Sequence, residues 1–306
     1  MFADQDTNVV YLSELFLCRY PGIAKRVCKA LDAAGVRVGI MSCTYDIWVR
    51  DFLPVQVGHR RFVQFRYDPP YLKGDELFIT PPGAARFLPQ VRHCTISPIR
   101  LDGGNVVRWR DAAIMTDRLY AWNRDQRPSA LRRAVQELLA VDRLIVIPSE
   151  PHDGLGHAED FGHADGIVRF LDANTVLIND YSRAHPTYHR SLTACLRRHK
   201  LGYVPIPYQP SNEKKSGVWS ATGCYLNFLQ VRGVVIAPVY GIPTDAPAIR
   251  ALRKAFHPTP VVTVESSLLA QEGGVLNCIA WNIALPLRPT VAERTARLLP
   301  RPQQWR

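Results

Sequence analysis

Several features that would restrict the function of this chain are missing from its sequence. Its 306 residues contain no basic, apolar, small-residue leader and no uninterrupted apolar run of membrane length, so we expect neither export nor membrane insertion. No CxxC pair and no HExxH spacing is present, which removes the commonest sequence patterns for zinc binding. We therefore expect a cytoplasmic protein that has no membrane partner and needs no cofactor.

Cysteine and charge are present but not concentrated. The cysteines are odd in number and scattered, which argues against a disulfide framework and predicts reduced thiols: Cys18, Cys28, Cys43, Cys94, Cys195, Cys224 and Cys278. The formal charge is +11, but the arginines are spread along the chain instead of forming one basic block with interleaved aromatics. The charge predicts nonspecific anion binding and no specific nucleic-acid partner.

Hydrophobic periodicity predicts alternating strands and helices along the chain. The strongest helical patterns cover 21–34, 129–140, 188–198 and 246–256, each with apolar residues on one face. Period-two or β-branched runs predict strands at 8–12, 36–41, 61–67, 143–148, 203–208 and 261–264. Three hairpins are predicted, pairing 105–109 with 112–116, 166–170 with 175–178, and 225–229 with 234–239.

Together these elements form a repeat. A hairpin, a helix and a strand recur about every 50 to 60 residues, without the even alternation typical of a doubly wound parallel sheet. We expect one α/β domain over residues 1–306, built of repeated ββαβ units. Its basic, proline-rich tail at 287–306 is expected to fold back as a short helix around 291–299 or to be partly disordered.

One stretch, residues 272–281, places a lone cysteine where it could react. Gly273 and Gly274 permit an abrupt turn, after which a strand could direct Cys278 at a cleft. A thiol in that position can be a nucleophile. The alternative is a buried structural cysteine, which is the commoner role of a free cysteine.

A second stretch, residues 159–166, combines histidine with acids. His163 and Asp165 would share one face of an extended segment, and a satisfied surface histidine is the alternative. A catalytic metal is a further alternative, since the loop also holds these imidazoles and acids: His152, His157, Asp153, Glu159 and Asp160.

Four ordered segments carry a family resemblance: Trp48-Val49-Arg50-Asp51, Asp102-Gly103-Gly104-Asn105, Gly162-His163-Ala164-Asp165 and Gly273-Gly274-Val275-Leu276-Asn277-Cys278. In order and spacing, from about residue 40 to residue 285, the chain resembles the agmatine deiminases and bacterial peptidylarginine deiminases of the guanidine-modifying superfamily. The segment 225–228 resembles another part of these enzymes. The resemblance implies a pentein fold, a five-bladed pseudosymmetric α/β propeller with a central active site.

The resemblance also implies roles for individual residues. Cys278 would be the nucleophile, His163 the general acid and base, and Asp51 and Asp165 the pair that binds the guanidinium. Two carboxylates suit a planar, forked cation, because paired N–H to O bonds leave its central carbon exposed to a thiolate. The two nearby carboxylates should also raise the pKa of the Cys278 thiol in the free enzyme.

Three other residues are assigned to substrate binding with open alternatives. Trp48 and Arg50 could line the cleft, although packing of the indole and a salt bridge of the arginine explain them equally well. Asn105 matches a family turn together with Asp102, and both fit a structural role better than a catalytic one. Asn277 stands where these enzymes usually have histidine, which leaves the exact substrate open.

The expected function is therefore hydrolysis of a guanidino group with release of ammonia, through a covalent thiouronium on the cysteine. The favoured substrate is a small molecule such as agmatine, which would place the enzyme in polyamine biosynthesis; peptidylarginine and free arginine are the alternatives. Alternatives of another class are a metal-dependent hydrolase and a pentein that binds without catalysis. A homodimer is possible.

Overall fold

The computed structural model describes residues 1–91, 93–150, 162–215 and 217–286. The predicted tail helix at 291–299 lies outside these residues, as do the loop histidines 152 and 157. In the described part of the chain, no helix combines the length and apolarity needed to cross a membrane.

Five three-stranded sheets with one shared topology make up most of the described structure. In each, the first two strands are antiparallel and the third lies parallel to the second: β3-β4-β5, β6-β7-β8, β9-β10-β11, β14-β15-β16 and β17-β1-β2. The last strand, β17 (Ala280–Ile283), pairs with the first strand, β1 (Val9–Ser13), and thereby joins the two ends of the chain. The predicted repeat is confirmed as an α/β arrangement.

The remaining strands have the following bounds: β2 (Arg37–Met41), β3 (Val55–Gly58), β4 (Arg61–Arg66), β5 (His93–Arg100), β6 (Val107–Trp109), β7 (Ala112–Thr116), β8 (Arg143–Ile147), β9 (Val168–Phe170), β10 (Thr175–Asn179), β11 (Gly202–Ile206), β14 (Leu229–Val231), β15 (Val234–Val239) and β16 (Val261–Glu265). A separate two-stranded ribbon consists of β12 (Lys214–Lys215) and β13 (Val218–Trp219).

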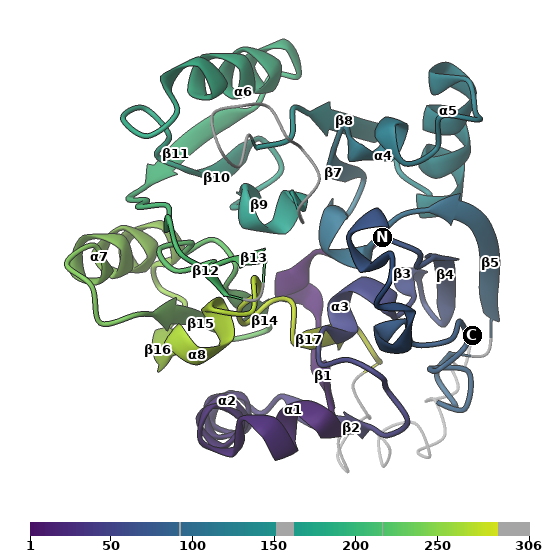
Figure 1. The fold of residues 1–306 in the computed structure, drawn as a ribbon, viewed down its shortest axis with the longest axis horizontal. Coiled ribbons are helices and arrows are strands. Elements are labelled where there is room, and N and C mark those ends of the chain that lie inside the picture. The colour runs from purple at the N-terminus through teal and green to yellow at the C-terminus, as the bar shows by residue number, and fades with distance from the viewer. Residues whose placement is uncertain (92, 151–161, 216, 287–306) are drawn as a thin grey trace, which may run out of the picture.

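The long helices lie on the outside of the molecule and the first strands of the sheets lie toward its middle (Figure 1). The helices are α1 (Glu14–Arg19), α2 (Pro21–Ala33), α3 (Val49–Phe52), α4 (Arg118–Ala121), α5 (Pro128–Leu139), α6 (Pro186–Arg198), α7 (Asp245–Phe256) and α8 (Ser267–Ala270). The four long helices match the predicted periodic segments. In α5, for example, Leu131, Val135 and Leu139 are buried, and each fully buried leucine stabilises the fold by roughly 1.5–3 kcal/mol.

Three predicted segments differ from the structure. The strand expected at 225–229 begins only at Leu229, because the preceding residues turn and the Asn227 carbonyl accepts the Asn277 N–H at 3.1 Å. The segment 162–165 is not extended but enters a 3₁₀ turn, Ala164–Gly166. The cysteine segment becomes a strand at Ala280, so Cys278 lies in the turn before β17.

The first strand of every sheet carries one buried polar side chain in its middle. Each of these residues is at most 6% exposed: Gln56, Arg108, Arg169, Gln230 and Asn282. The residues singled out from the sequence lie in the segments that directly precede β3, β6, β9 and β17.

Some of the buried polar residues meet around the N-terminal segment in what we call the central cluster: Asp4, Arg50, Arg108, Arg169 and Asn282. Asp4 lies 3.1 Å from Arg108 Nε and 2.8 Å from Arg169 Nη2, and it accepts a bond from Asn282 Nδ2. Arg50 and Arg108 both donate to Asn282 Oδ1, at 2.6 and 2.9 Å. The neighbouring arginines outweigh the effect of burial and hold the pKa of Asp4 below its ordinary value. The cluster joins α3, β6, β9 and β17 around a single carboxylate.

Candidate active site

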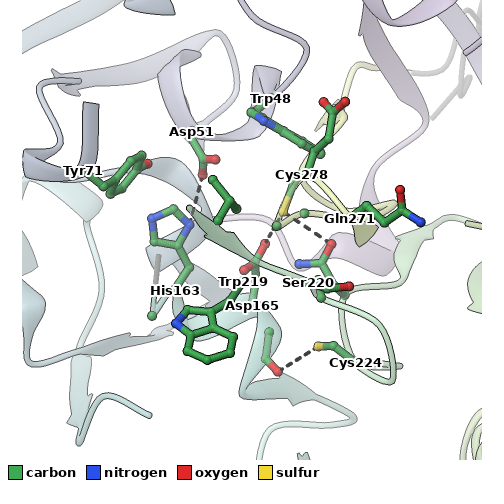
Figure 2. Close-up of a pocket in the computed structure, with 18 of the residues that line it drawn as sticks. Trp48, Asp51, Tyr71, His163, Asp165, Trp219, Ser220, Cys224, Gln271 and Cys278 are labelled. Carbon is green, nitrogen blue, oxygen red and sulfur yellow. Dashed lines mark hydrogen bonds and ion pairs between the residues drawn. The ribbon is translucent and has the colours of Figure 1, made fainter. Parts of the chain in front are cut away.

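A cavity of about 510 Å³ opens beside the middle of the molecule, a size typical of small-molecule sites. Its wall includes five residues expected from the sequence: Trp48, Asp51, His163, Asp165 and Cys278. Figure 2 shows Cys278 facing the space between Trp48, Asp51, His163 and Asp165. Residues that are far apart in the chain therefore meet because each belongs to the loop before an inner strand.

The thiol of Cys278 is 93% buried and has polar neighbours on two sides. Its Sγ lies 3.4 Å from Asn227 Oδ1 and 3.9 Å from Asp165 Oδ2. Burial raises the pKa of Cys278 well above its ordinary value, and the charges of Asp165 and Asp51 raise it further. The direction of this shift agrees with the expectation, and it favours the protonated thiol at neutral pH.

His163 is held by carboxylates on both nitrogens. Nε2 lies 2.9 Å from Asp102 Oδ2, and Nδ1 lies 3.5 Å from Asp51 Oδ1. Tyr71 donates its hydroxyl to the same Asp102 oxygen at 2.7 Å, and the rings of Tyr71 and Trp122 stand edge-on to the imidazole. Burial alone would lower the pKa of His163, but Asp51 and Asp102 outweigh it and raise the pKa to about 9. The imidazole is therefore a cationic proton donor near neutral pH.

The Asp51 carboxylate has a pKa raised close to neutral pH. Burial raises its pKa to about 7 against the lowering effect of His163, and the charges of Asp102 and Asp165 raise it further. The N–H of Gly104 donates to Asp51 Oδ1 at 2.9 Å. A Cβ at Gly104 would stand 2.6 Å from that oxygen and 2.8 Å from His163 Nδ1, so this position requires glycine.

Asp165 is positioned by Asn277, the residue before the cysteine. The Asn277 amide donates to Asp165 Oδ2 at 2.6 Å, and its Oδ1 accepts from Arg50 Nη2 at 3.1 Å. The Arg50 backbone N–H also donates to the Cys278 carbonyl at 3.1 Å. The site therefore touches the central cluster through one amide side chain.

Two of the expected substrate-binding residues are not in the cavity wall. Arg50 is 8% exposed and its guanidinium is used by Asn277 and Asn282. Asn105 is fully buried, and its Oδ1 accepts from Thr116 and from the Ala164 N–H, which fixes the loop that carries His163. The structural role given as the alternative for Asn105 agrees with these contacts. The salt bridge given as the alternative for Arg50 is not found among the described residues, because its guanidinium donates to asparagine oxygens and to no carboxylate. Trp48 does line the cavity, and its ring packs where a Cβ of Gly274 would otherwise stand, at 2.7 Å.

Other residues of the site were not singled out from the sequence. Asn227 contacts the thiol from a segment that resembled a family motif without an assigned role. Tyr71 lies in a short 3₁₀ turn and Trp219 in the two-stranded ribbon, neither of which has a periodicity that marks it, and Asp46 lies two residues before Trp48. In the described residues, no group of three or more His, Cys, Asp or Glu side chains could hold a metal ion, and most of the proposed histidine-loop ligands lie outside those residues.

Comparisons with known proteins agree on one enzyme group. The sequence profile of the Porphyromonas-type peptidyl-arginine deiminases matches residues 13–284. An agmatine deiminase of Stutzerimonas stutzeri (strain A1501) is 29% identical over 297 residues, covering 84% of this chain and 79% of the relative.

Solved structures of this group share the fold. An agmatine deiminase of C. jejuni with substrate bound superposes with a TM-score of 0.75 at 17% identity, over 94% of this chain and 96% of that one. An agmatine deiminase of Enterococcus faecalis gives a TM-score of 0.74 at 15% identity, over 93% and 95% of the two chains. At these identities the likeness establishes a common α/β fold.

Proposed function

Since the chain belongs to the Porphyromonas-type peptidyl-arginine deiminase family, we propose that it hydrolyses the guanidino group of a small cationic substrate such as agmatine. The reaction breaks a C–N bond of a linear amidine with water and releases ammonia. The observation that carries the proposal is the convergence of a thiol, a cationic imidazole and two carboxylates on one cavity. A pentein arrangement, with the five sheets as the blades of a pseudosymmetric propeller and residues 1–306 as one catalytic domain, is part of this proposal.

In the first step, Asp51 and Asp165 bind the guanidinium through charge-assisted N–H to O bonds. The bound cation stabilises the thiolate that two carboxylates otherwise disfavour, so Cys278 releases its proton to solvent as the substrate enters. The sulfur attacks the central carbon and forms a C–S bond, giving a tetrahedral adduct. His163 donates a proton to the leaving nitrogen, the C–N bond breaks, and ammonia departs from a covalent thiouronium.

In the second step, the imidazole that lost its proton accepts one from water. The hydroxide forms a C–O bond with the thiouronium carbon and the C–S bond breaks. The added hydroxyl passes its proton to the departing sulfur, which releases a ureido product and regenerates the thiol. Asp102 receives the His163 Nε2 hydrogen bond, keeps the ring oriented and stabilises its charged form in both steps.

Ammonia release tests this function. The purified protein would be assayed with agmatine, free arginine and a peptidylarginine, in parallel with Cys278→Ser. We expect the highest kcat/KM with agmatine, and a loss of at least about 10³-fold in the serine variant, the order seen when a covalent nucleophile is removed. Equal turnover by the two proteins would show that Cys278 is not the nucleophile. A higher kcat/KM with peptidylarginine than with agmatine would show that peptidylarginine is the preferred substrate.

A further inference from the structure

The cavity extends beyond the guanidinium-binding group, and its charged lining is unbalanced. Six acids but only two lysine or arginine residues line it among the described residues: Asp46, Asp51, Asp75, Glu150, Asp165 and Glu272 against Arg19 and Lys215. Both cations have partners, since Arg19 bonds the Glu272 carboxylate at 2.9 Å and the exposed Lys215 donates to Gln271. The acids therefore outnumber the cations available inside the cavity.

Among the buried and half-buried acids of the cavity in the described residues, Asp46 stands out because it has neither an ion pair nor a side-chain donor, whereas Glu150 accepts from two tyrosines and Asp165 from Asn277. Asp46 is 91% buried, and its only hydrogen bond among the described residues is from the adjacent Ile47 N–H to Oδ1 at 2.6 Å. No cation of the described residues lies within ion-pair distance of it, and its side chain forms part of the cavity wall. A buried carboxylate costs free energy unless a cation or donor meets it, so this group is suited to a charged ligand.

Asp46 and Asp51 lie at opposite ends of one short segment, with Trp48 between them. The indole lines the cavity and is backed by Gly274, which leaves its apolar surface beside the group around Cys278 (Figure 2). This segment thus gives the cavity wall two carboxylates and an aromatic surface. An alkyl chain with a cation at each end has a group to meet each of the three.

We propose that Asp46 binds the ammonium group at the far end of the substrate, so that the enzyme selects aminoalkylguanidines over guanidines that end in a carboxylate or a peptide. This inference rests on the proposed function. Glu272 contributes negative charge to the same end of the cavity but is held by Arg19 and by the Tyr20 hydroxyl. Burial, opposed by the Ile47 N–H and Arg19, raises the pKa of Asp46 to about 6, so it is mostly ionised at neutral pH and able to attract an ammonium.

The test compares two substrates that differ only in the ammonium group. Agmatine and n-butylguanidine carry the same four-carbon chain, but the second ends in a methyl group. For agmatine, Asp46→Asn should raise KM about tenfold to hundredfold, the effect of losing one charge-assisted bond, with kcat little changed. For n-butylguanidine, the wild type and Asp46→Asn should have the same KM, because no ammonium is present to bind.

Asp75→Asn is the matched control, since Asp75 lines the same cavity but is exposed to solvent. Its removal should change the KM for agmatine by less than about threefold, because solvent screens exposed charges. Asparagine at position 46 keeps the oxygen that accepts the Ile47 N–H, and thermal melting checks that the variant folds. If it does not, agmatine and n-butylguanidine binding to Cys278→Ser, with and without Asp46→Ala, gives the same comparison.

Each outcome decides the proposal. A KM effect confined to agmatine supports it. Equal effects of Asp46→Asn on both substrates, or none on either, would overturn it, as would an equally large effect of Asp75→Asn. Failure of the wild type to release ammonia from any guanidine would instead contradict the proposed function, so the two failures are distinguishable.

Discussion

Two clusters of charged side chains meet at Asn277, and their charge balances are opposite. In the central cluster, three arginines and Asn282 surround one carboxylate, and the pKa of Asp4 is held down. In the pocket cluster, which consists of Asp51, Asp102, His163, Asp165 and Cys278, the carboxylates outnumber the cation. There the pKa of Asp51 rises to about 7 and that of Cys278 rises well above its ordinary value.

The charges of the central cluster stabilise the fold, whereas the carboxylates of the pocket cluster lack sufficient cations until a ligand binds. The Asp4 carboxylate accepts hydrogen bonds from side chains of three strands, β6, β9 and β17, so its ionised form stabilises the folded state. Asp51 has a backbone N–H and a histidine at 3.5 Å, which do not offset its burial. An arriving guanidinium supplies the missing cation, and this explains why a protein would retain an arrangement that is unfavourable when empty.

The largest expected effect of a charge substitution is on stability. Asp4→Asn should lower the free energy of unfolding by about 3–5 kcal/mol, the cost of leaving buried arginines without their carboxylate. Because the pKa of Asp4 is depressed, its contribution is present above the ordinary range for an aspartate and is lost as pH falls through the depressed value. Urea denaturation at pH 7 measures the loss. A change below 1 kcal/mol would mean that the cluster does not hold the sheets together.

Substitutions in the pocket cluster should reduce activity, and that of Asp51 should not reduce stability. Asp51→Asn and Asp165→Asn should each reduce kcat/KM by about 2–4 kcal/mol of transition-state stabilisation, because each loses a charge-assisted bond to the buried guanidinium. The melting temperature of Asp51→Asn should stay the same or rise, since its raised pKa shows that the ionised carboxylate is unfavourable in the folded state. Steady-state kinetics and thermal melts of the same preparations test both parts; a destabilised but fully active variant would reverse the comparison.

The pH profile should show the titration of two pocket-cluster groups, Asp51 and His163, in one experiment. Binding requires ionised Asp51 and proton donation requires protonated His163, so kcat/KM should rise through about pH 7 and fall through about pH 9. Asp102→Asn removes a charge that raises the pKa of His163, and the alkaline limb should therefore move to lower pH. An alkaline limb that does not move would mean that His163 is not the group titrating there.

The smallest effect is expected where an ion pair is exposed. Asp6 pairs with Arg110 at 3.3 Å, two residues from Asp4, but the Arg110 side chain is 61% exposed. Asp6→Asn should change the free energy of unfolding by no more than about 1 kcal/mol, because solvent screens such pairs. This variant is the control for Asp4→Asn, and equal losses would show that the N-terminal segment as a whole, and not the buried carboxylate, is responsible.

The sequence predicted elements and motif residues better than it predicted contacts. Long periodic helices such as α5 were placed within a residue or two, because one apolar face determines them. Cys278, His163, Asp51 and Asp165 were found because ordered motifs carry them. The central role of Asp4 could not be predicted, since its partners come from strands separated from it by more than one hundred residues.

Positions that depend on the packing between repeats were also missed. Asn227 and Asp46 lie in irregular turns whose neighbours come from other sheets, and no periodicity marks them. Arg50 was open between the cleft and a salt bridge. Its guanidinium instead bonds Asn277 and Asn282, which lie more than two hundred residues away in the chain. A repeated signal was nevertheless available: Val-Arg-aromatic occurs both at 107–109 and at 168–170, in equivalent strands.

The protonation state of Cys278 tests the central claim most directly. Thiolate absorbance in the ultraviolet would be followed against pH, with Cys278→Ala subtracting the other six thiols, in the absence and presence of a cationic guanidine that binds without turnover. The account predicts a protonated thiol in the free protein at pH 7 and a lower pKa when the guanidine is bound, because the cation neutralises Asp51 and Asp165. A thiolate that is already fully formed at pH 7 in the free protein, with no response to the guanidine, would contradict it.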